Sequence, residues 1–375
     1  MKIAVLGSGM VGRTMAIDLA LKHKVTSFDA SESSLQILKE KSVVINTVRA
    51  DLSAYETYPE LLNPFDIIVT AVPGFMGYNT LKAVIEAEKN VVDISFFPEN
   101  ALTLDTLAKE KNVTAITDCG VAPGVSNLVL GYYNSIMQVE SFECYVGGLP
   151  KTRKKPFEYK APFSPIDVIE EYTRPARLKE NGKIVTKPAM TEIELMDFDE
   201  VGTLECFNTD GLRSLLFTMP HIPDMKEKTL RYPGHAELII ALQRSGFFGE
   251  EAISYKGEQI VPLNYTSAIL LNEWKLQPGE EEFTIMKVIV KGKMNDQPKV
   301  IEFTMLDKYN MATQTSSMSR TTGYTCTAAV NAFAEGLFNE KGVFPPELVG
   351  KNESCFNYIL SYLKERNVNW VKKEY

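Results

Sequence analysis

The stretch KIAVLGSGMVGRTMAIDLALKH (residues 2–23) decides the fold. It holds a short β-rich apolar run, then Gly7, Gly9 and Gly12 at G-x-G-x-x-G spacing, then a helical pattern. The first glycine permits a tight turn, the second lets backbone approach a pyrophosphate, and the third lets helix and strand pack closely. The amino terminus of the helix offers N–H groups to a phosphate. The order strand, glycine turn, helix therefore predicts a dinucleotide site.

Further apolar runs continue this pattern along the first third of the chain. They alternate with helical stretches and cover residues 24–29, 43–48, 66–72, 90–95 and 113–118. Strands that alternate with helices predict an α/β Rossmann fold with a doubly wound parallel sheet.

The residues that follow the predicted strands indicate how a cofactor is held. Asp29 ends the second strand, where a carboxylate accepts hydrogen bonds from ribose hydroxyls and repels a 2′-phosphate. No arginine follows it in DASESS (29–34), so NAD is favoured over NADP. Ligands bind outside the carboxyl ends of the strands. Besides the three glycines and Asp29, the expected cofactor contacts are Met10, Val11, Ala71, Val72, Pro73 and Ser95.

Composition excludes several other classes of protein. The net charge is −8 and no apolar run approaches the ~18 residues of a membrane span, which argues against nucleic-acid and membrane partners. Five cysteines without a Cys-x-x-Cys pair indicate free thiols in a reducing cytoplasm. The three histidines lack metal-ligand spacing, so no metal is expected.

The length of 375 residues predicts two domains. After residue 123 the alternation stops, and the period-2 pattern FTIMKVIVKG (283–292) predicts a sheet with one covered face. We expect a mainly antiparallel α+β domain over residues 124–317, which binds the substrate and pairs in a homo-oligomer. Residues 1–123 and about 318–375 are expected to form the discontinuous nucleotide domain.

Several motifs together resemble the saccharopine dehydrogenase-like family, and most closely its lysine 6-dehydrogenases. They are GSGMVG (7–12), VVDISFFPENALTLDTLAKEKNVTAITDCGVAPGVSN (91–127), NTDGLRSL (208–215) and TLRYPGH (229–235). Saccharopine reductases of this family typically carry Asp-Pro-Gly at residues 122–124 and Asn-Arg-Asp at residues 212–214. This chain has Ala-Pro-Gly and Leu-Arg-Ser there, which favours the lysine-oxidising branch.

The resemblance implies NAD-dependent oxidation of a C–N bond, in which a hydride leaves the carbon that bears the amine. With lysine, the resulting imine would hydrolyse and cyclise. Saccharopine or carboxynorspermidine dehydrogenation is an alternative within this class. A protein that binds NAD(H) without catalysis is the alternative from another class.

An amino-acid substrate brings a carboxylate, which matches a guanidinium group. Arg213 and Arg231 are the candidates, each with a structural ion pair as the alternative role. The substrate ammonium must lose a proton, and His235 is the candidate base unless it only begins the helix that follows Pro233-Gly234. Asp93 or Asp118 is the alternative, as an anchor or acceptor for the ammonium. We expect Tyr232 to pack, with its hydroxyl available to the substrate.

Overall fold

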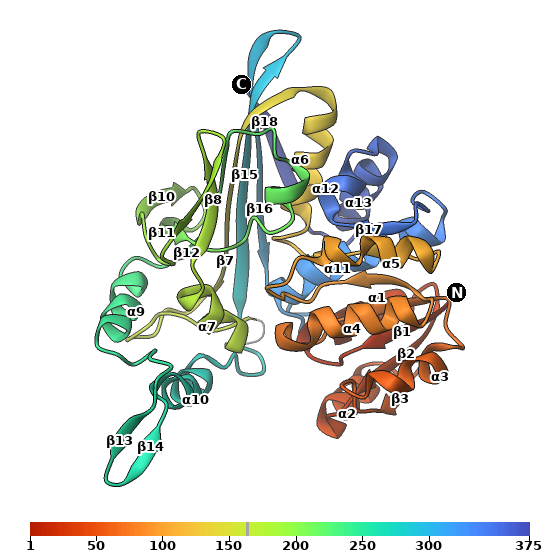
Figure 1. Ribbon diagram of the computed structural model, residues 1–375, viewed down its shortest axis with the longest axis horizontal. Coiled ribbons are helices and arrows are strands. Elements are labelled where there is room, and N and C mark those ends of the chain that lie inside the picture. The colour runs from red at the N-terminus through yellow and green to blue at the C-terminus, as the bar shows by residue number, and fades with distance from the viewer. Residues whose placement is uncertain (163–164) are drawn as a thin grey trace.

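Two sheets lie side by side in the computed structural model, which describes residues 1–162 and 165–375, without the side chains of residues 165–167 (Figure 1). The first sheet is parallel, with strand order β17-β6-β5-β4-β1-β2-β3. Its strands are β1 (Lys2–Leu6), β2 (Lys24–Asp29), β3 (Asn46–Arg49), β4 (Ile67–Thr70), β5 (Asn90–Asp93), β6 (Thr114–Ile116) and β17 (Gly342–Phe344). The predicted doubly wound sheet is confirmed.

Alternate residues of β1 show that both faces of this sheet are covered. Ile3 and Val5 belong to one apolar core, whereas Ala4 and Leu6 belong to another. Burial on both faces is the usual state of a parallel sheet. The helical segments of this half are α1 (Met10–Leu19), α2 (Glu32–Lys41), η1 (Tyr55–Thr57), α3 (Tyr58–Leu62), α4 (Gly74–Glu86), η2 (Ala101–Leu104), α5 (Asp105–Glu110), α6 (Val125–Ile136), α11 (Ser317–Ala334), α12 (Pro346–Gly350) and α13 (Glu353–Glu365).

The third strand begins later than the sequence predicts. Val43 and Val44 lie in a turn and are largely exposed, and β3 begins at Asn46. Their apolar side chains are therefore no part of the core, although they suggested a strand from residue 43.

The second sheet is mixed and mainly antiparallel, with the order β10-β11-β12-β7-β15-β16-β18 and with β8 and β9 beside β12. Only β12 and β7 pair in parallel among these strands. The strands are β7 (Gln138–Pro150), β8 (Ala176–Glu180), β9 (Lys183–Lys187), β10 (Glu194–Phe198), β11 (Gly202–Asn208), β12 (Asp224–Arg231), β15 (Glu282–Met294), β16 (Gln297–Lys308) and β18 (Trp370–Glu374). The predicted α+β class of this half is confirmed.

Shorter elements complete this half. They are α7 (Pro165–Thr173), α8 (Leu215–Thr218), α9 (His235–Arg244), α10 (Pro262–Trp274) and the hairpin of β13 (Ile253–Tyr255) and β14 (Glu258–Ile260), which projects at the lower left of Figure 1.

The end of the chain is divided between the two sheets. α11 contacts α1, and β17 pairs with β6 in the first sheet. The last strand, β18, instead pairs with β16 at the edge of the second sheet, where Trp370 packs beside Phe303. The expectation that all of residues 318–375 return to the nucleotide domain is therefore wrong for β18, which covers an otherwise open strand edge.

In the described part of the chain, no helix combines the length and the apolar composition that crossing a membrane requires. The five cysteines are buried and unpaired.

Candidate active site

A cleft of about 810 Å³ lies between the two halves of the chain. One wall comes from the glycine loop and the carboxyl ends of the first sheet, and the other from α7, β7, β12 and the loop after β11. Residues from both halves therefore meet around a single cavity.

The three glycines differ in the space around them. Gly7 has φ +109°, and a Cβ there would lie 2.4 Å from the Ala71 carbonyl oxygen. A Cβ on Gly12 would lie 2.0 Å from the Gly7 oxygen, so helix and strand touch at this point. A Cβ on Gly9 would meet no atom within 4 Å, and Gly9 lines the cleft.

The start of α1 fits an anionic group. No side chain caps this helix terminus, and Met10 and Val11 line the cleft beside Gly9. Uncapped N–H groups at a helix start attract phosphate. The loop thus fits the pyrophosphate of a dinucleotide.

Asp29 connects the glycine loop to the turn that follows β2. Its carboxylate accepts the N–H of Ser8 at 2.6 Å and the N–H of Ser31 at 2.7 Å, and it lines the cleft. Arg13 donates to the Ser8 carbonyl at 3.0 Å, and Arg49 donates to the Ala30 carbonyl at 3.3 Å.

The two arginines were missed in the sequence because neither directly follows Asp29. They come from α1 and from the end of β3, which pairs with β2. Both arginines bind backbone carbonyls next to the Asp29 carboxylate, although neither of them lines the cleft.

Ala71, Val72, Pro73 and Ser95 all line the cleft. Asp93 does not belong to its lining. Asp93 accepts a hydrogen bond from Thr70 Oγ1 at 2.5 Å and from the Ser95 N–H at 3.2 Å. Thr70 and Asp93 are register partners on neighbouring strands, so their side chains are neighbours on one face of the sheet, and Asp93 is fully buried. Burial raises the pKa of Asp93 to about 7.

Asp118 lines the cleft and forms a buried ion pair with Arg213. Arg213 Nε donates to Asp118 Oδ2 at 3.1 Å, and Nη2 lies 2.9 Å from Oδ1. Arg213 also donates to the Phe97 carbonyl and lies over the Phe96 ring at 4.8 Å. Arg213 itself does not line the cleft. The ion-pair alternative for Arg213 is the one that the structure supports, and its role is to hold Asp118.

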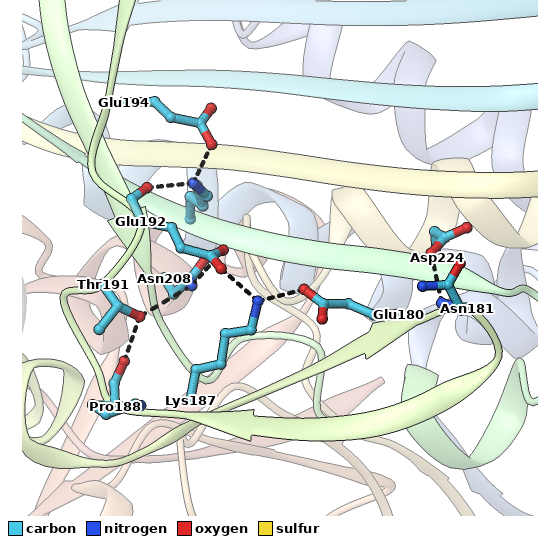
Figure 2. A network of polar contacts seen from close by, with 10 residues as sticks. Glu180, Asn181, Lys187, Pro188, Thr191, Glu192, Glu194, Asn208 and Asp224 are labelled. Atoms are coloured by element: carbon cyan, nitrogen blue, oxygen red, sulfur yellow. Dashed lines mark hydrogen bonds and ion pairs between the residues drawn. The ribbon is translucent and has the colours of Figure 1, made fainter.

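Strand β12 presents alternate side chains to the cleft. Glu227, Thr229 and Arg231 line it, as the period of two along a strand requires. Lys228 points to the opposite face, where it donates to the Glu192 carbonyl and to Glu194 Oε1, both at 2.6 Å. Figure 2 shows Glu192 and Glu194 in the polar network of that face.

Arg231 is held by aromatic and acidic neighbours. Its Nε donates to the Tyr172 hydroxyl at 2.9 Å, and its Nη2 lies 3.2 Å from Glu171 Oε2. The guanidinium lies 4.4 Å from the centre of the Tyr159 ring. Arg231 therefore combines a place in the cleft with a structural ion pair.

His235 lies behind Arg231 and does not line the cleft. Its Nδ1 is 3.0 Å from the Phe157 carbonyl, and its Nε2 is 2.9 Å from the Tyr172 hydroxyl. Because a carbonyl only accepts, Nδ1 carries the proton and Nε2 accepts from Tyr172. Burial and then the charge of Arg231 lower the pKa of His235 to about 3. The hypothesis that His235 is the base is thus wrong, and the histidine instead orients Tyr172.

Tyr232 packs outside the cleft. Its hydroxyl donates to the Pro150 carbonyl at 2.9 Å, and the Arg153 guanidinium lies 4.5 Å from its ring centre. The side chain is buried, and its hydroxyl is already used within the fold.

Several polar residues of the cleft were missed in the sequence. They are Glu170, Glu171, Arg174, Thr209, Asp210 and Glu227. Thr209 and Asp210 stand in NTDGLRSL, the motif from which only the arginine drew attention. Glu170, Glu171 and Arg174 belong to EEYTR (170–174), whose charges resemble those of a solvated helix end.

No group of three or more His, Cys, Asp or Glu side chains is placed to hold a metal ion among residues 1–162 and 168–375.

Sequence comparison matches both halves of the chain to known domains. The saccharopine dehydrogenase NADP binding domain matches residues 3–116, and the saccharopine dehydrogenase C-terminal domain matches residues 120–368. The chain belongs to the saccharopine dehydrogenase family. The resemblance noted in the sequence is confirmed at this level, whereas the comparisons give no specific support to a lysine 6-dehydrogenase.

Individual relatives are distant. Alpha-aminoadipic semialdehyde synthase of Arabidopsis thaliana is 27% identical over 332 residues, which cover 77% of this chain and 31% of that protein. This saccharopine dehydrogenase family member thus spans about a third of that relative. Saccharopine dehydrogenase [NADP(+), L-glutamate-forming] of Schizosaccharomyces pombe is 23% identical over 319 residues, covering 79% and 68%. Carboxyaminopropylagmatine dehydrogenase of Synechocystis is 19% identical, covering 92% of each chain.

A solved structure shares the whole fold. Apo saccharopine dehydrogenase (L-Glu forming) from Saccharomyces cerevisiae has a TM-score of 0.81 and 19% identity, and the alignment covers 100% of this chain and 99% of that one.

Proposed function

We propose that this member of the saccharopine dehydrogenase family is an NAD(P)-dependent oxidoreductase that acts on the C–N bond of an amino-acid substrate. One observation carries the proposal. A single cleft is lined on one side by the glycine loop, at the start of α1, and on the other side by carboxylates and guanidinium groups of the second half. A secondary amine of the saccharopine or carboxyalkyl-polyamine type has the support of the relatives' names. Lysine is the further candidate.

The residues present fit a nicotinamide dinucleotide. Gly9 and the start of α1 would hold the pyrophosphate, Asp29 the ribose, and Ala71 to Pro73 the edge that leads toward Ser95. We propose NAD, because Asp29 would accept hydrogen bonds from the ribose hydroxyls. If the cofactor were NADP instead, Arg13 and Arg49 would be the groups that contact its 2′-phosphate. When bound, the cofactor supplies the hydride acceptor for the carbon that bears the nitrogen.

The chain's own residues bind and orient the amine. Asp118 lines the cleft together with Ser95 and is fixed by Arg213, so its carboxylate is placed to hold the substrate ammonium and to accept its proton. No hydride can leave the adjacent carbon until that nitrogen has a free lone pair, which makes this proton transfer obligatory.

A guanidinium group is needed for the substrate carboxylate. Arg231 already donates to Tyr172, Glu171 and Tyr159. Arg174 lines the same cleft, pairs only with Glu170 among the described residues, and is less buried. We therefore assign the carboxylate contact to Arg174, with Arg231 beside it.

The test is nicotinamide absorbance with purified protein, with NAD and NADP in separate assays, and with saccharopine, carboxynorspermidine and L-lysine as substrates. Reduction of the cofactor by at least one amine is expected. Tight NADH binding without turnover of any amine would favour the non-catalytic alternative instead.

A further inference from the structure

Most of the carboxylates that line the cleft pair with an arginine, but one does not. Apart from Asp29, which ends β2, and Asp51, which follows β3, five carboxylates line it among the side chains that the structure describes. Four of them form ion pairs with an arginine: Asp118 with Arg213, Glu170 with Arg174, Glu171 with Arg231, and Asp210 with Arg177.

Glu227 is the exception. In the part of the chain that the structure describes, no lysine, arginine or histidine forms an ion pair with it, and its side chain accepts one side-chain hydrogen bond, from Thr209 Oγ1 at 2.7 Å. Glu227 is only 7% exposed, yet it lines the cleft. A buried carboxylate without a cation is unfavourable, and such groups usually pair or stay protonated.

The surroundings of Glu227 add to this cost. Burial and then the charges of Glu171 and Asp210 raise its pKa to about 8. The backbone at Gly211 lies so close that a Cβ there would be 2.3 Å from Glu227 Oε2. The loop after β11 therefore packs against this carboxyl group without supplying a cation.

Unlike Glu227, the guanidinium groups that line the cleft are already paired. Arg174 and Arg231 both line it, and each already has a carboxylate partner. A substrate with several carboxylates would have to compete with Glu170 and Glu171 for these arginines. A substrate with an additional ammonium group would instead meet an unpaired carboxyl group at Glu227.

We propose that Glu227 binds a cationic amine of the substrate other than the reacting one, so that the cleft takes substrates with a second amine in preference to those that carry the reacting amine alone. The inference rests on the proposed function, because it assigns a substrate class to the same site. Thr209 holds the Glu227 carboxyl group in place for this contact.

The test measures binding by calorimetry to protein saturated with NADH. The probes are carboxynorspermidine, L-lysine and saccharopine, all with a second amine, and 6-aminohexanoate, which is lysine without its α-amine. The variant is Glu227→Gln, which keeps an acceptor for Thr209 and removes the carboxyl group that an ammonium would ionise. Glu282→Gln is the matched control: Glu282 is another buried carboxyl group, with a pKa raised by burial to about 8, which accepts the Ser317 N–H outside the cleft. NADH binding and thermal unfolding check that both variants fold.

Wild-type protein should bind at least one of the three probes with a second amine, and it should bind L-lysine about tenfold or more tightly than 6-aminohexanoate. Glu227→Gln should weaken binding of the probes with a second amine by about 10- to 100-fold, as expected for a lost charge-assisted hydrogen bond, with Glu282→Gln like wild type. Equal affinity for L-lysine and 6-aminohexanoate, no binding of any probe with a second amine, or wild-type affinity in Glu227→Gln would overturn the inference.

Turnover in the same preparations separates the two proposals. Oxidation of an amine whose binding is unchanged in Glu227→Gln would sustain the proposed function and refute the inference. Binding of a probe that depends on Glu227, without oxidation of any amine, would sustain the inference and refute the proposed function. If Glu227→Gln fails to fold, the affinities of the wild type for L-lysine and 6-aminohexanoate decide the inference alone.

Discussion

Gly9 and Gly12 stand three positions apart, and alanine should have opposite consequences at the two sites. A Cβ at Gly12 would lie 2.0 Å from the Gly7 oxygen and 2.9 Å from the Gly7 carbonyl carbon, both backbone atoms that cannot rotate away. Overpacking of this kind costs about 1–3 kcal/mol, and occasionally more. Gly12→Ala should therefore lower the melting temperature.

At Gly9 the fold leaves room for alanine. No atom lies within 4 Å of a Cβ there, and the backbone, with φ −63° and ψ −170°, suits any residue. Gly9→Ala should keep or slightly raise the stability, by about 0.4–1 kcal/mol through the unfolded state. Its methyl group would enter the space of the pyrophosphate. The same overpacking cost of about 1–3 kcal/mol would then destabilise the complex with NADH and weaken NADH binding by about 5- to 150-fold.

Thermal unfolding and NADH fluorescence titration measure the two effects on the same preparations. Wild-type NADH affinity in Gly9→Ala would refute the placement of the pyrophosphate at this loop. An unchanged melting temperature in Gly12→Ala would refute the close contact between α1 and β1.

Substitutions at three further residues test the other assignments. Asp118→Asn should lower kcat by about 100-fold or more, since it removes the proton acceptor, while NADH affinity stays at the wild-type value; an unchanged kcat would exclude Asp118 from proton transfer. Arg174→Ala should raise KM by about 10- to 100-fold through loss of a charge-assisted pair, with partial recovery in Arg174→Lys; a wild-type KM in the alanine variant would place the substrate carboxylate elsewhere. Asp93 has a pKa raised to about 7 in the folded protein, so the folded state keeps a proton that the unfolded chain releases near pH 4, and stability falls as pH rises between these values. Asp93→Asn should lose less stability than wild type across that pH window, which thermal unfolding at a series of pH values would show. Parallel curves of melting temperature against pH for the two proteins would contradict the buried neutral carboxyl group.

The parts of the site that depend on local order could be predicted from the sequence. Gly7 and Gly12 meet neighbouring backbone, Gly9 stands between them, and Asp29 ends a strand, so spacing alone placed them. Ala71 to Pro73 followed from the rule that ligands bind beyond strand ends.

The roles of the polar residues depended on partners that are distant in the sequence. His235 resembles a base beside a motif arginine until Tyr172, 63 residues away, is found on its Nε2. Arg213 resembles a free guanidinium until Asp118, 95 residues away, is found beside it. Glu227 stands between Lys226 and Lys228, so in the sequence it resembles part of a solvated strand. Because side chains alternate along a strand, Glu227 lines the cleft and the two lysines beside it do not.

Direct transfer of hydrogen from the carbon that bears the nitrogen tests the central claim most directly. The amine that the protein oxidises is prepared with deuterium on that carbon, and the reduced nicotinamide cofactor is analysed by mass spectrometry. The account predicts a reduced cofactor that carries one deuterium per turnover. Reduced cofactor without deuterium, or no reduction with any amine of the panel, would contradict it.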